Sequence, residues 1–402
     1  MTAGDDGMKI RQISTDERRL VSVPIQAYGF QPSPAPEGML DRLRGHQRYY
    51  EEHVTLVAEL DGVAVADASA VPMRQNVRGA VYEMAGVAGV ATLPQARRRG
   101  YARALVTEIL GVMRDRGYVV SALYPFRPSF YGRFGYVGLP MTRTVTFSPS
   151  SVAGLLRMDL AGTVRWGPVA DHYAAYRDFI GRLLSERHGF ALLPESRMAQ
   201  LREAGDRWLA TAWVGGVVAG AVTYHIDGFA GDLVADDLLI ASPLGRALLL
   251  QFFAAHTDQV ARITATIPAG EMPELWATDF AAVTQATTSF PDSPAPMARV
   301  LSIEGLAGMP AGSARVTVEI ADDPFIAGRY TLDGSAGTLE VRHAAEAAPE
   351  ATLTAAGLSG LIYGVLDPDE VSIRGFGQVP GDAAARLRAL FPRRIPYLHA
   401  TF

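Results

Sequence analysis

The pattern of apolar and polar positions predicts a strand, a short basic loop and a helix in direct succession within the first third of the chain. Residues 82–92 (YEMAGVAGVAT) are mostly apolar and lack a helical period, which favours a strand. Residues 102–113 (ARALVTEILGVM) place an apolar stripe on one helical face, formed by Leu105, Ile109, Leu110 and Met113. The loop between them consists of Arg97, Arg98, Arg99, Gly100, Tyr101 and Ala102. A helix N-terminus has unpaired N–H groups and a partial positive charge, so this loop is a candidate pyrophosphate site.

Two similar hairpins suggest an internal repeat. Residues 54–67 alternate around the turn Asp61-Gly62, and residues 208–226 have Gly215-Gly216 between β-branched and aromatic flanks. The second stretch has no Asp, Glu, Lys or Arg and approaches the length of a membrane span. The central glycine pair favours a hairpin instead.

The repeat extends beyond the hairpins. An apolar run, the loop 242–247 and the helical stretch 248–253 follow the second hairpin in the same order as in the first unit. The second loop has Ser242 where the first has Arg97, and Arg246 is its one cation. Because it lacks the basic cluster, we interpret this loop as structural.

Two linkers rich in Pro and Ser divide the chain into three predicted domains. They are 147–151 (FSPSS) and 290–296 (FPDSPAP). The expected domains are residues 1–150, 151–296 and 297–402.

The last third predicts a mixed unit of strands and helices. Residues 313–320 and 337–342 alternate as strands do, and residues 380–390 have a helical pattern. Residues 351–354, leading into 358–366, resemble the sterol carrier protein fold. The apolar side chains of that last stretch are more often core than a lipid tunnel.

Composition narrows the classes of function. The chain has 402 residues, 49% of them hydrophobic, a net charge of -5 and no cysteine. The acidic balance argues against a nucleic-acid binder and suits a cationic small substrate. The eight histidines form no H-x₃₋₅-H or H-E-x-x-H pair, so we predict no metal site. The opening residues have no apolar core of a signal peptide, so we expect a cytoplasmic protein without a membrane segment.

A second motif lies one helix after the basic loop. It comprises Leu123-Tyr124-Pro125 and residues 130–136 (FYGRFGY), with Tyr131 near its centre. The spacing of Arg97, Gly100 and Ala102 resembles the acetyl-coenzyme A loop of GNAT N-acetyltransferases. The second motif resembles the stretch of that family in which a Tyr lies beside the bound thioester.

Together with the repeat, the C-terminal unit and the last residue Phe402, these motifs resemble the enhanced intracellular survival (Eis) family. The resemblance implies tandem GNAT domains, the first active and the second degenerate, followed by a sterol-carrier-protein-like domain. It implies an acetyl-coenzyme A dependent enzyme that acetylates amines of aminoglycoside antibiotics, often at several positions, and assembles as a hexamer.

The resemblance also assigns site residues. Backbone groups of Val90, Ala91 and Thr92 are expected to contact the pantetheine amides, since an unpaired strand edge offers such groups. The pyrophosphate is expected at Arg97, Arg98, Arg99, Gly100, Tyr101 and Ala102. The general base in this family is the α-carboxylate of the last residue, here Phe402.

Amine acetylation needs an acid for the thiolate and a base for the ammonium. Tyr131 is the candidate acid, because a phenol with a pKa of about 10 is protonated at neutral pH. The alternative is an aromatic core residue. For Phe402, an α-carboxyl with a pKa of about 3.5 becomes a better base when it is desolvated. Residues 395–402 are mostly apolar, as a buried tail would be, although the tail could also be a strand pinned by Phe402.

The sequence leaves the acceptor open. Glu37 and Asp41 could form an acidic pocket wall, but solvated helix charges explain them better. Thr401 stands where family members that act on aminoglycosides tend to have an acidic residue. This difference puts the breadth of the aminoglycoside range of this chain in doubt. The alternatives are a protein lysine or N-terminal acetyltransferase, and a lipid-binding module with an inactive GNAT remnant. The intact loop from Arg97 to Ala102 counts against an inactive remnant.

Overall fold

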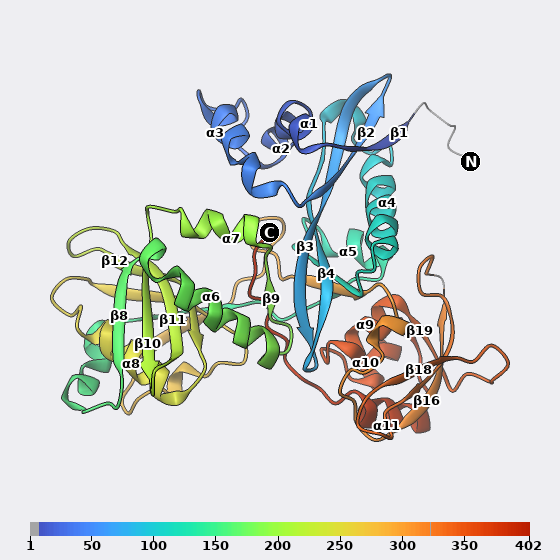
Figure 1. The fold of residues 1–402 in the computed structure, drawn as a ribbon. Helices are drawn as coiled ribbons and strands as arrows, with labels where there is room; N and C mark the ends of the chain where they lie inside the picture. Colours follow the sequence, from blue (N-terminus) through green and yellow to red (C-terminus); the bar gives the residue numbers. More distant parts are fainter. Residues whose placement is uncertain (1–7, 322) are drawn as a thin grey trace. The chain divides into compact units, whose positions relative to one another are not determined.

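The computed structural model describes residues 8–321 and 323–402 (Figure 1). The chain divides into two compact units, the first composed of Met1–Leu139, His188–Met198 and Pro296–Phe402, the second of Pro140–Arg187 and Ala199–Ala295. Residues 1–7, on which part of the expectation about export rests, lie outside the described residues. The fold is a mixed α/β fold, as expected.

The main sheet of the first unit has the order β1-β2-β3-β4-β5-β15-β6, and β9 pairs with β3. All neighbouring strands are antiparallel except β4 and β5, which are parallel. The strands are β1 (Lys9–Ile13), β2 (Val54–Leu60), β3 (Val63–Val77), β4 (Ala80–Thr92), β5 (Val120–Leu123), β6 (Val137–Gly138), β9 (Ala191–Leu192) and β15 (Met297–Val300).

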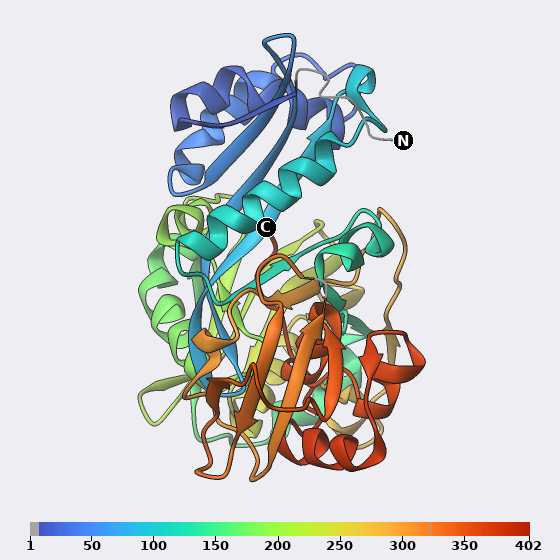
Figure 2. The same ribbon diagram turned by 90° about the vertical axis from the view of Figure 1, so that its right-hand side faces the viewer.

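Local sequence explains the first hairpin and the long helix. Asp61 and Gly62 both have positive φ, 51° and 79°, as a two-residue hairpin turn of the favoured kind requires. The predicted stripe Leu105, Ile109, Leu110 and Met113 is fully buried on α4 (Tyr101–Asp115). Figure 2 shows α4 running along the sheet of β3 and β4. The predicted strand, loop and helix are therefore confirmed.

Short helices complete this part of the first unit. They are α1 (Thr15–Leu20), α2 (Ser22–Phe30), α3 (Met39–Gly45), η1 (His46–Tyr50), η2 (Pro94–Ala96), α5 (Pro128–Tyr131), η3 (Gly132–Phe134) and η6 (Glu304–Leu306). Helix α7 (Glu195–Arg202) crosses the boundary between the units at residue 198. Helix α2 packs on β3 and β4, which brings its polar side chains to the strands of the candidate site.

The C-terminal part of the first unit has its own sheet, with the order β18-β17-β16-β19-β20. Its elements are β16 (Arg315–Ala321), β17 (Gly328–Asp333), β18 (Glu340–His343), β19 (Ala351–Thr354), α9 (Ala355–Ile362), α10 (Pro368–Ile373), β20 (Gly377–Gln378) and α11 (Gly381–Leu390). Its core is continuous with the β3–β4 hairpin, because Met73, Val77 and Met84 share one apolar cluster with Val318 and Leu358.

The sheets do not follow the expected ranges 1–150, 151–296 and 297–402. Strand β15 lies between β5 and β6 of the N-terminal sheet, although its sequence was expected to open the third domain. Strand β7 (Arg143–Phe147) pairs with strands of the second unit, although it was expected in the first domain. Pro- and Ser-rich stretches indicate loops between elements. They do not indicate which sheet the next strand joins, because its partners lie far away in the sequence.

The sheet of the second unit has the order β14-β7-β13-β12-β11-β10-β8. Its remaining elements are η4 (Pro149–Arg157), β8 (Thr163–Pro168), α6 (Val169–Glu186), β10 (Trp208–Val214), β11 (Val217–Ile226), β12 (Asp232–Ile240), α8 (Pro243–Ala254), β13 (Arg262–Ile267), η5 (Pro273–Leu275) and β14 (Ala282–Gln285). Strands β12 and β13 are parallel and joined through α8, as β4 and β5 are through α4. The predicted repeat is thus present in the strand order.

The long uncharged stretch is a hairpin. Gly215 and Gly216 have positive φ and join β10 to β11, which pair antiparallel. Within residues 8–321 and 323–402, no helix is both long and apolar enough to cross a membrane.

Candidate active site

Strands β4 and β5 part at a defined position. Their parallel pairing runs from Met84 opposite Val120 to Val87 opposite Leu123, where β5 ends. Strand β4 continues to Thr92 while it pairs with β3 along its other edge. The backbone edge of residues 88–92 that faces away from β3 is therefore available to an extended ligand.

A bulge lies in this open part of β4. The register with β3 shifts between Asp67 and Ser69, so that more residues lie on β4 than on β3 at this point. Gly89 has a φ of +62°, and a Cβ there would lie 2.6 Å from Gln26 Nε2. The positive φ at position 89 therefore favours glycine.

The basic loop connects this edge to α4. Arg98 and Gly100 have positive φ, 61° and 91°, and open space surrounds the position that a Cβ on Gly100 would take. The N–H of Ala104 donates to the carbonyl of Gly100, so the N–H groups of the preceding turn have no partner within the helix. Such a turn attracts an anion.

The arginines of the loop lie at the surface. Arg97 Nε donates to the carbonyl of Thr92 at 3.1 Å, which ties the loop to the end of β4. Its guanidinium lies 5.6 Å from the ring centre of Tyr28. The hydroxyl of Tyr101 is buried and has no hydrogen-bond partner in the part of the chain that the structure describes. An open strand edge, unpaired N–H groups, cations and this unused hydroxyl fit an extended ligand with a phosphate group.

The second loop lacks these properties. Ser242 Oγ accepts the N–H of Gly245 at 3.1 Å, and Arg246 forms an ion pair with Glu271 at 2.8 Å. A Cβ on Gly245 would lie 2.2 Å from the carbonyl oxygen of Ala219, whereas Gly100 faces open space. The loop is packed and capped internally, which agrees with the structural interpretation of it.

Tyr131 ends α5 and is 3% exposed. Its ring contacts those of Phe126, Phe130 and Tyr136 in edge-to-face geometry, at centroid distances of 5.4, 5.0 and 6.2 Å. Burial raises the pKa of Tyr131 above its ordinary value, and Tyr136 adds to this. The phenol therefore keeps its proton at neutral pH, as an acid must, although the same packing is that of a core residue.

Phe402 lies where β4 and β5 begin to part. Its ring covers Gly86, whose added Cβ would meet Phe402 Cε2 at 2.3 Å. Tyr124 follows β5, contacts the Phe402 ring edge-to-face at 5.6 Å, and donates its hydroxyl to the carbonyl of Ala400 at 3.1 Å. The sequence-predicted Phe402 and Tyr131 thus both lie against the segment that follows β5, through Tyr124 and Phe126 respectively.

The tail before Phe402 is buried without being a strand. Tyr397, Leu398 and Ala400 are 7%, 3% and 5% exposed, and residues 392–402 have no strand or helix structure. His399 stacks on Phe190 with the rings nearly parallel, 4.6 Å apart. Side-chain packing therefore holds the tail, as its apolar composition predicted, and the alternative of a terminal strand is wrong.

Asp67 is a buried polar residue of the candidate site that the sequence pattern did not predict. It is fully buried opposite the bulge; its Oδ2 accepts hydrogen bonds from Ser22 Oγ at 2.5 Å and Gln26 Nε2 at 2.9 Å. Its Oδ1 is buried without a hydrogen-bond partner among the described residues. Burial raises the pKa of Asp67 to about 7, against the opposing effects of Ser22, Gln26 and Arg18. The one available signal was an acidic residue between two alanines in an apolar strand.

Other acidic candidates are solvated. Glu37 and Asp41 are exposed, and Asp41 pairs with Arg44 on the same helix at 3.0 Å. Among the described residues, no group of three or more His, Asp or Glu side chains is arranged to hold a metal ion.

Comparison with known proteins defines the class to which this site belongs. Residues 9–138 match the acetyltransferase (GNAT) domain family. The parting of parallel strands β4 and β5 lies within this range, so the candidate site belongs to the part of the chain that is similar to GNAT acetyltransferase domains.

Curated proteins with a similar sequence include Eis proteins. A stretch of 65 residues is 43% identical to N-acetyltransferase Eis of Mycobacterium tuberculosis and of Mycobacterium bovis BCG. It covers 16% of this chain and 16% of each relative. The predicted resemblance to the Eis family is confirmed.

Solved structures match over the whole fold. A GCN5-related N-acetyltransferase from Anabaena variabilis has a TM-score of 0.84 at 17% identity, covering 98% of this chain and 100% of that one. One from Kribbella flavida has a TM-score of 0.80 at 22% identity, covering 100% of both chains. Eis1 from Mycobacterium abscessus has a TM-score of 0.78 at 20% identity, covering 98% and 100%. These likenesses establish the fold.

We predict that Gly86→Ala displaces Phe402 and lowers turnover without unfolding the protein. The new methyl would occupy the place of the Phe402 ring, and a ring on the last residue can move away at little cost in stability. A misplaced group at a reacting centre costs about 10²-fold in rate, to be measured as kcat for acetyl transfer. Gly111→Ala is the control, because its Cβ would be 3.9 Å from its nearest neighbour. Normal kcat in Gly86→Ala would contradict a role for the tail position.

We predict that Asp67→Asn changes the pH dependence of stability. Between pH 5 and pH 8 the free energy of unfolding should fall less in the variant than in the parent protein. The pKa of Asp67 rises from 3.8 to about 7 on folding, so the native state holds more protons than the unfolded state between these values. Its contribution to stability is therefore lost as pH rises through this window. Asparagine cannot ionise, so the variant lacks this loss. Urea unfolding at both pH values measures it, with exposed Asp41→Asn as control, and equal pH dependence in variant and parent would disprove it.

Proposed function

We propose that the chain is an acetyl-coenzyme A dependent N-acetyltransferase acting on primary amines of small polycationic molecules, aminoglycosides among them, at more than one position. The observation that carries the proposal is the seating of Phe402 on Gly86, where β4 and β5 part within the GNAT domain. It brings the last residue of the chain, with its carboxylate, close to the start of the strand edge that a thioester donor would follow.

Acetyl-coenzyme A would supply an acetyl group activated as a thioester. The backbone of Val90, Ala91 and Thr92 would receive its amide arm along the open edge of β4. Its pyrophosphate would lie at the N-terminus of α4, against Gly100 and Ala102, with Arg97, Arg98 and Arg99 as cations. The buried, unpartnered hydroxyl of Tyr101 supports a ligand at this position.

Two proton transfers are assigned to residues of the chain. The carboxylate of Phe402 takes a proton from the acceptor ammonium, either directly or through a water. Tyr131 gives its phenolic proton to the departing thiolate. Burial keeps the pKa of Tyr131 high, so the phenol is protonated before each turnover and recovers its proton afterwards.

The acceptor is inferred from charge. The net charge of -5 favours a cationic small molecule over a nucleic acid. Thr401, beside Phe402, is exposed and neutral, so this position adds no charge for a polycation. We propose a homo-oligomer, a hexamer by resemblance, that requires no metal.

The test is a thiol-release assay with acetyl-coenzyme A against aminoglycosides, polyamines and peptides that present a lysine or a free N-terminus. We expect release with aminoglycosides and mass shifts of more than one acetyl group. Release with peptides alone would replace the substrate class with protein amines. No release with any amine would refute the proposed function.

We predict that Tyr131→Phe lowers kcat by about 10²–10⁴-fold, the usual effect of losing a positioned acid. The ring and its aromatic contacts remain, so the affinity for acetyl-coenzyme A and the melting temperature should not change. Steady-state thiol release and thermal unfolding followed by circular dichroism measure both. A variant with near-normal kcat would make Tyr131 a packing residue.

We predict that one glycine added after Phe402 abolishes most turnover. The extension replaces the Phe402 carboxylate with a neutral amide and moves the charge away from Gly86, while it removes no buried side chain. Phe402→Leu is the matched variant, because it shortens the apolar group and keeps a carboxylate at the same position. We expect the extended protein to lose more activity than Phe402→Leu. A folded, extended protein with normal kcat would exclude this carboxylate as the base.

A further inference from the structure

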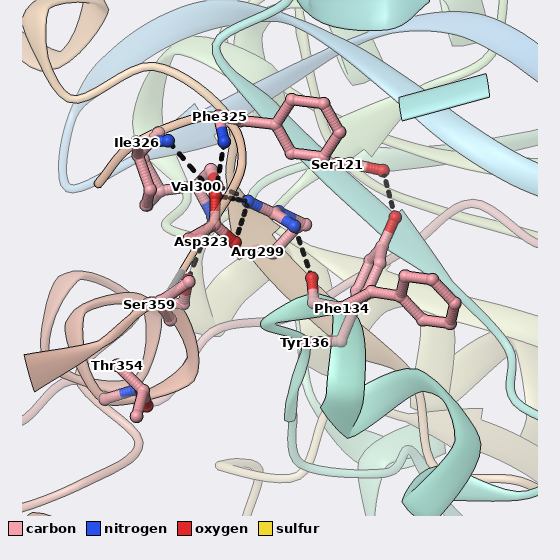
Figure 3. Close-up of polar contacts among 12 residues, drawn as sticks. Ser121, Phe134, Tyr136, Arg299, Val300, Asp323, Phe325, Ile326, Thr354 and Ser359 are labelled. Atoms are coloured by element: carbon pink, nitrogen blue, oxygen red, sulfur yellow. Dashed lines mark hydrogen bonds and ion pairs between the residues drawn. The ribbon is translucent and has the colours of Figure 1, made fainter. Parts of the chain in front are cut away.

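The turn that follows Tyr131 is held by a buried arginine from a distant part of the chain. Arg299 of β15 is 0% exposed, and Figure 3 shows its guanidinium between Phe134 and Asp323. Its Nη2 donates to both carboxylate oxygens of Asp323, at 3.1 and 3.0 Å, and its Nε donates to the carbonyl of Val300 at 3.0 Å. Its Nη1 donates to the carbonyl of Phe134.

Asp323 is itself fixed by the backbone. Its Oδ1 accepts the N–H groups of Phe325 at 2.9 Å and Ile326 at 3.1 Å, and it is 7% exposed. Two backbone N–H groups on Oδ1, together with one guanidinium nitrogen that donates to both carboxylate oxygens, leave the Asp323 side chain little freedom to turn. The guanidinium of Arg299 is therefore directed at the Phe134 carbonyl by groups that do not belong to the GNAT domain match.

Phe134 ends the 3₁₀ turn that begins directly after Tyr131. On the far side of this turn, the N–H of Tyr136 donates to the carbonyl of Tyr131 at 3.4 Å. The Tyr136 hydroxyl is 2.7 Å from Ser121 Oγ, which donates to the carbonyl of Ala85 at 2.8 Å. The segment 131–136 is thus held on one side by β4 and β5, and on the other by Arg299.

A buried ion pair contributes little net stability compared with apolar residues of the same volume, because both charges lose their hydration. The pair instead fixes the orientation of the Arg299 guanidinium toward the carbonyl of Phe134. We propose that Arg299, oriented by Asp323, is a positioning residue that sets the place of the Tyr131 hydroxyl during acetyl transfer. This inference rests on the proposed function, in which Tyr131 is the acid.

The variants are Arg299→Lys and Asp323→Asn, each made with Tyr131 and with Tyr131→Phe. Lysine keeps the charge but cannot bridge both partners as the planar guanidinium does. We expect Arg299→Lys to lower kcat about 10–100-fold, since small displacements of a reacting group have effects of this size. KM for acetyl-coenzyme A should not change. Asp323→Asn keeps one acceptor for Arg299 and should lose less.

The double variant separates positioning from general damage. If Arg299 acts through the Tyr131 hydroxyl, Arg299→Lys should lower kcat less than threefold once that hydroxyl is absent. Multiplied losses in the double variant would overturn the proposal, because they show independent effects. If Tyr131→Phe alone has normal kcat, Tyr131 is not the acid and the proposed function fails. This result differs from multiplied losses in the double variant, which would overturn only the positioning role of Arg299.

Ser359→Ala is the matched control for stability. Ser359 is buried, accepts the N–H of Val300 at 3.0 Å beside Arg299 and donates to the carbonyl of Ala355 at 2.6 Å, and among the described residues it has no hydrogen bond to the turn after Tyr131. We expect a lower melting temperature with unchanged kcat. A kcat loss in Ser359→Ala as large as that in Arg299→Lys would overturn the positioning role, since any loosening of β15 would then suffice. Should Arg299→Lys fail to fold, Asp323→Asn carries the same comparison.

Discussion

The early end of β5 is the constraint on which the rest of this site depends. Because β5 stops opposite Val87, β4 continues with one edge unpaired, and a bulge at Gly89 bends that edge. An unpaired edge inside a protein must find other partners. In this chain the parting of the strands receives the ring of Phe402 on Gly86, and the remaining edge leads to the helix N-terminus at Gly100.

The two copies of the strand–loop–helix arrangement show how the same topology can be open or closed to a ligand. Both join parallel strands through a helix. In the first, Gly100 faces open space and the loop cations lie at the surface. In the second, a Ser242 side chain caps the helix and Gly245 packs on a carbonyl. The first turn of α4 has no side-chain cap, whereas in α8 Ser242 accepts the N–H of Gly245 and Pro243 has no N–H to satisfy.

Features that depend on local sequence could be predicted. The hairpin turns, the buried stripe of α4 and the basic loop follow from residue types a few positions apart, as does the apolar tail. Features that depend on distant partners could not. Nothing in MARV at 297–300 indicates that β15 inserts beside β5, and the polar partners of Asp67 lie on a different element. The roles of Tyr131 and Phe402 remain predictions from resemblance, although the structure locates both side chains.

The polar groups buried around the site differ in how their charge is compensated. Arg299 and Asp323 offset each other's charge, and the partners of each are complete enough to fix an orientation. Asp67 has one oxygen without a partner, so its burial favours the protonated form instead. The first arrangement pairs two opposite charges, whereas the second is a single carboxyl group that changes its charge near neutral pH. Gln26 Nε2 donates to Asp67 and also lies 2.6 Å from the position that a Cβ on Gly89 would take, so this buried carboxyl group and the bulge share one polar neighbour.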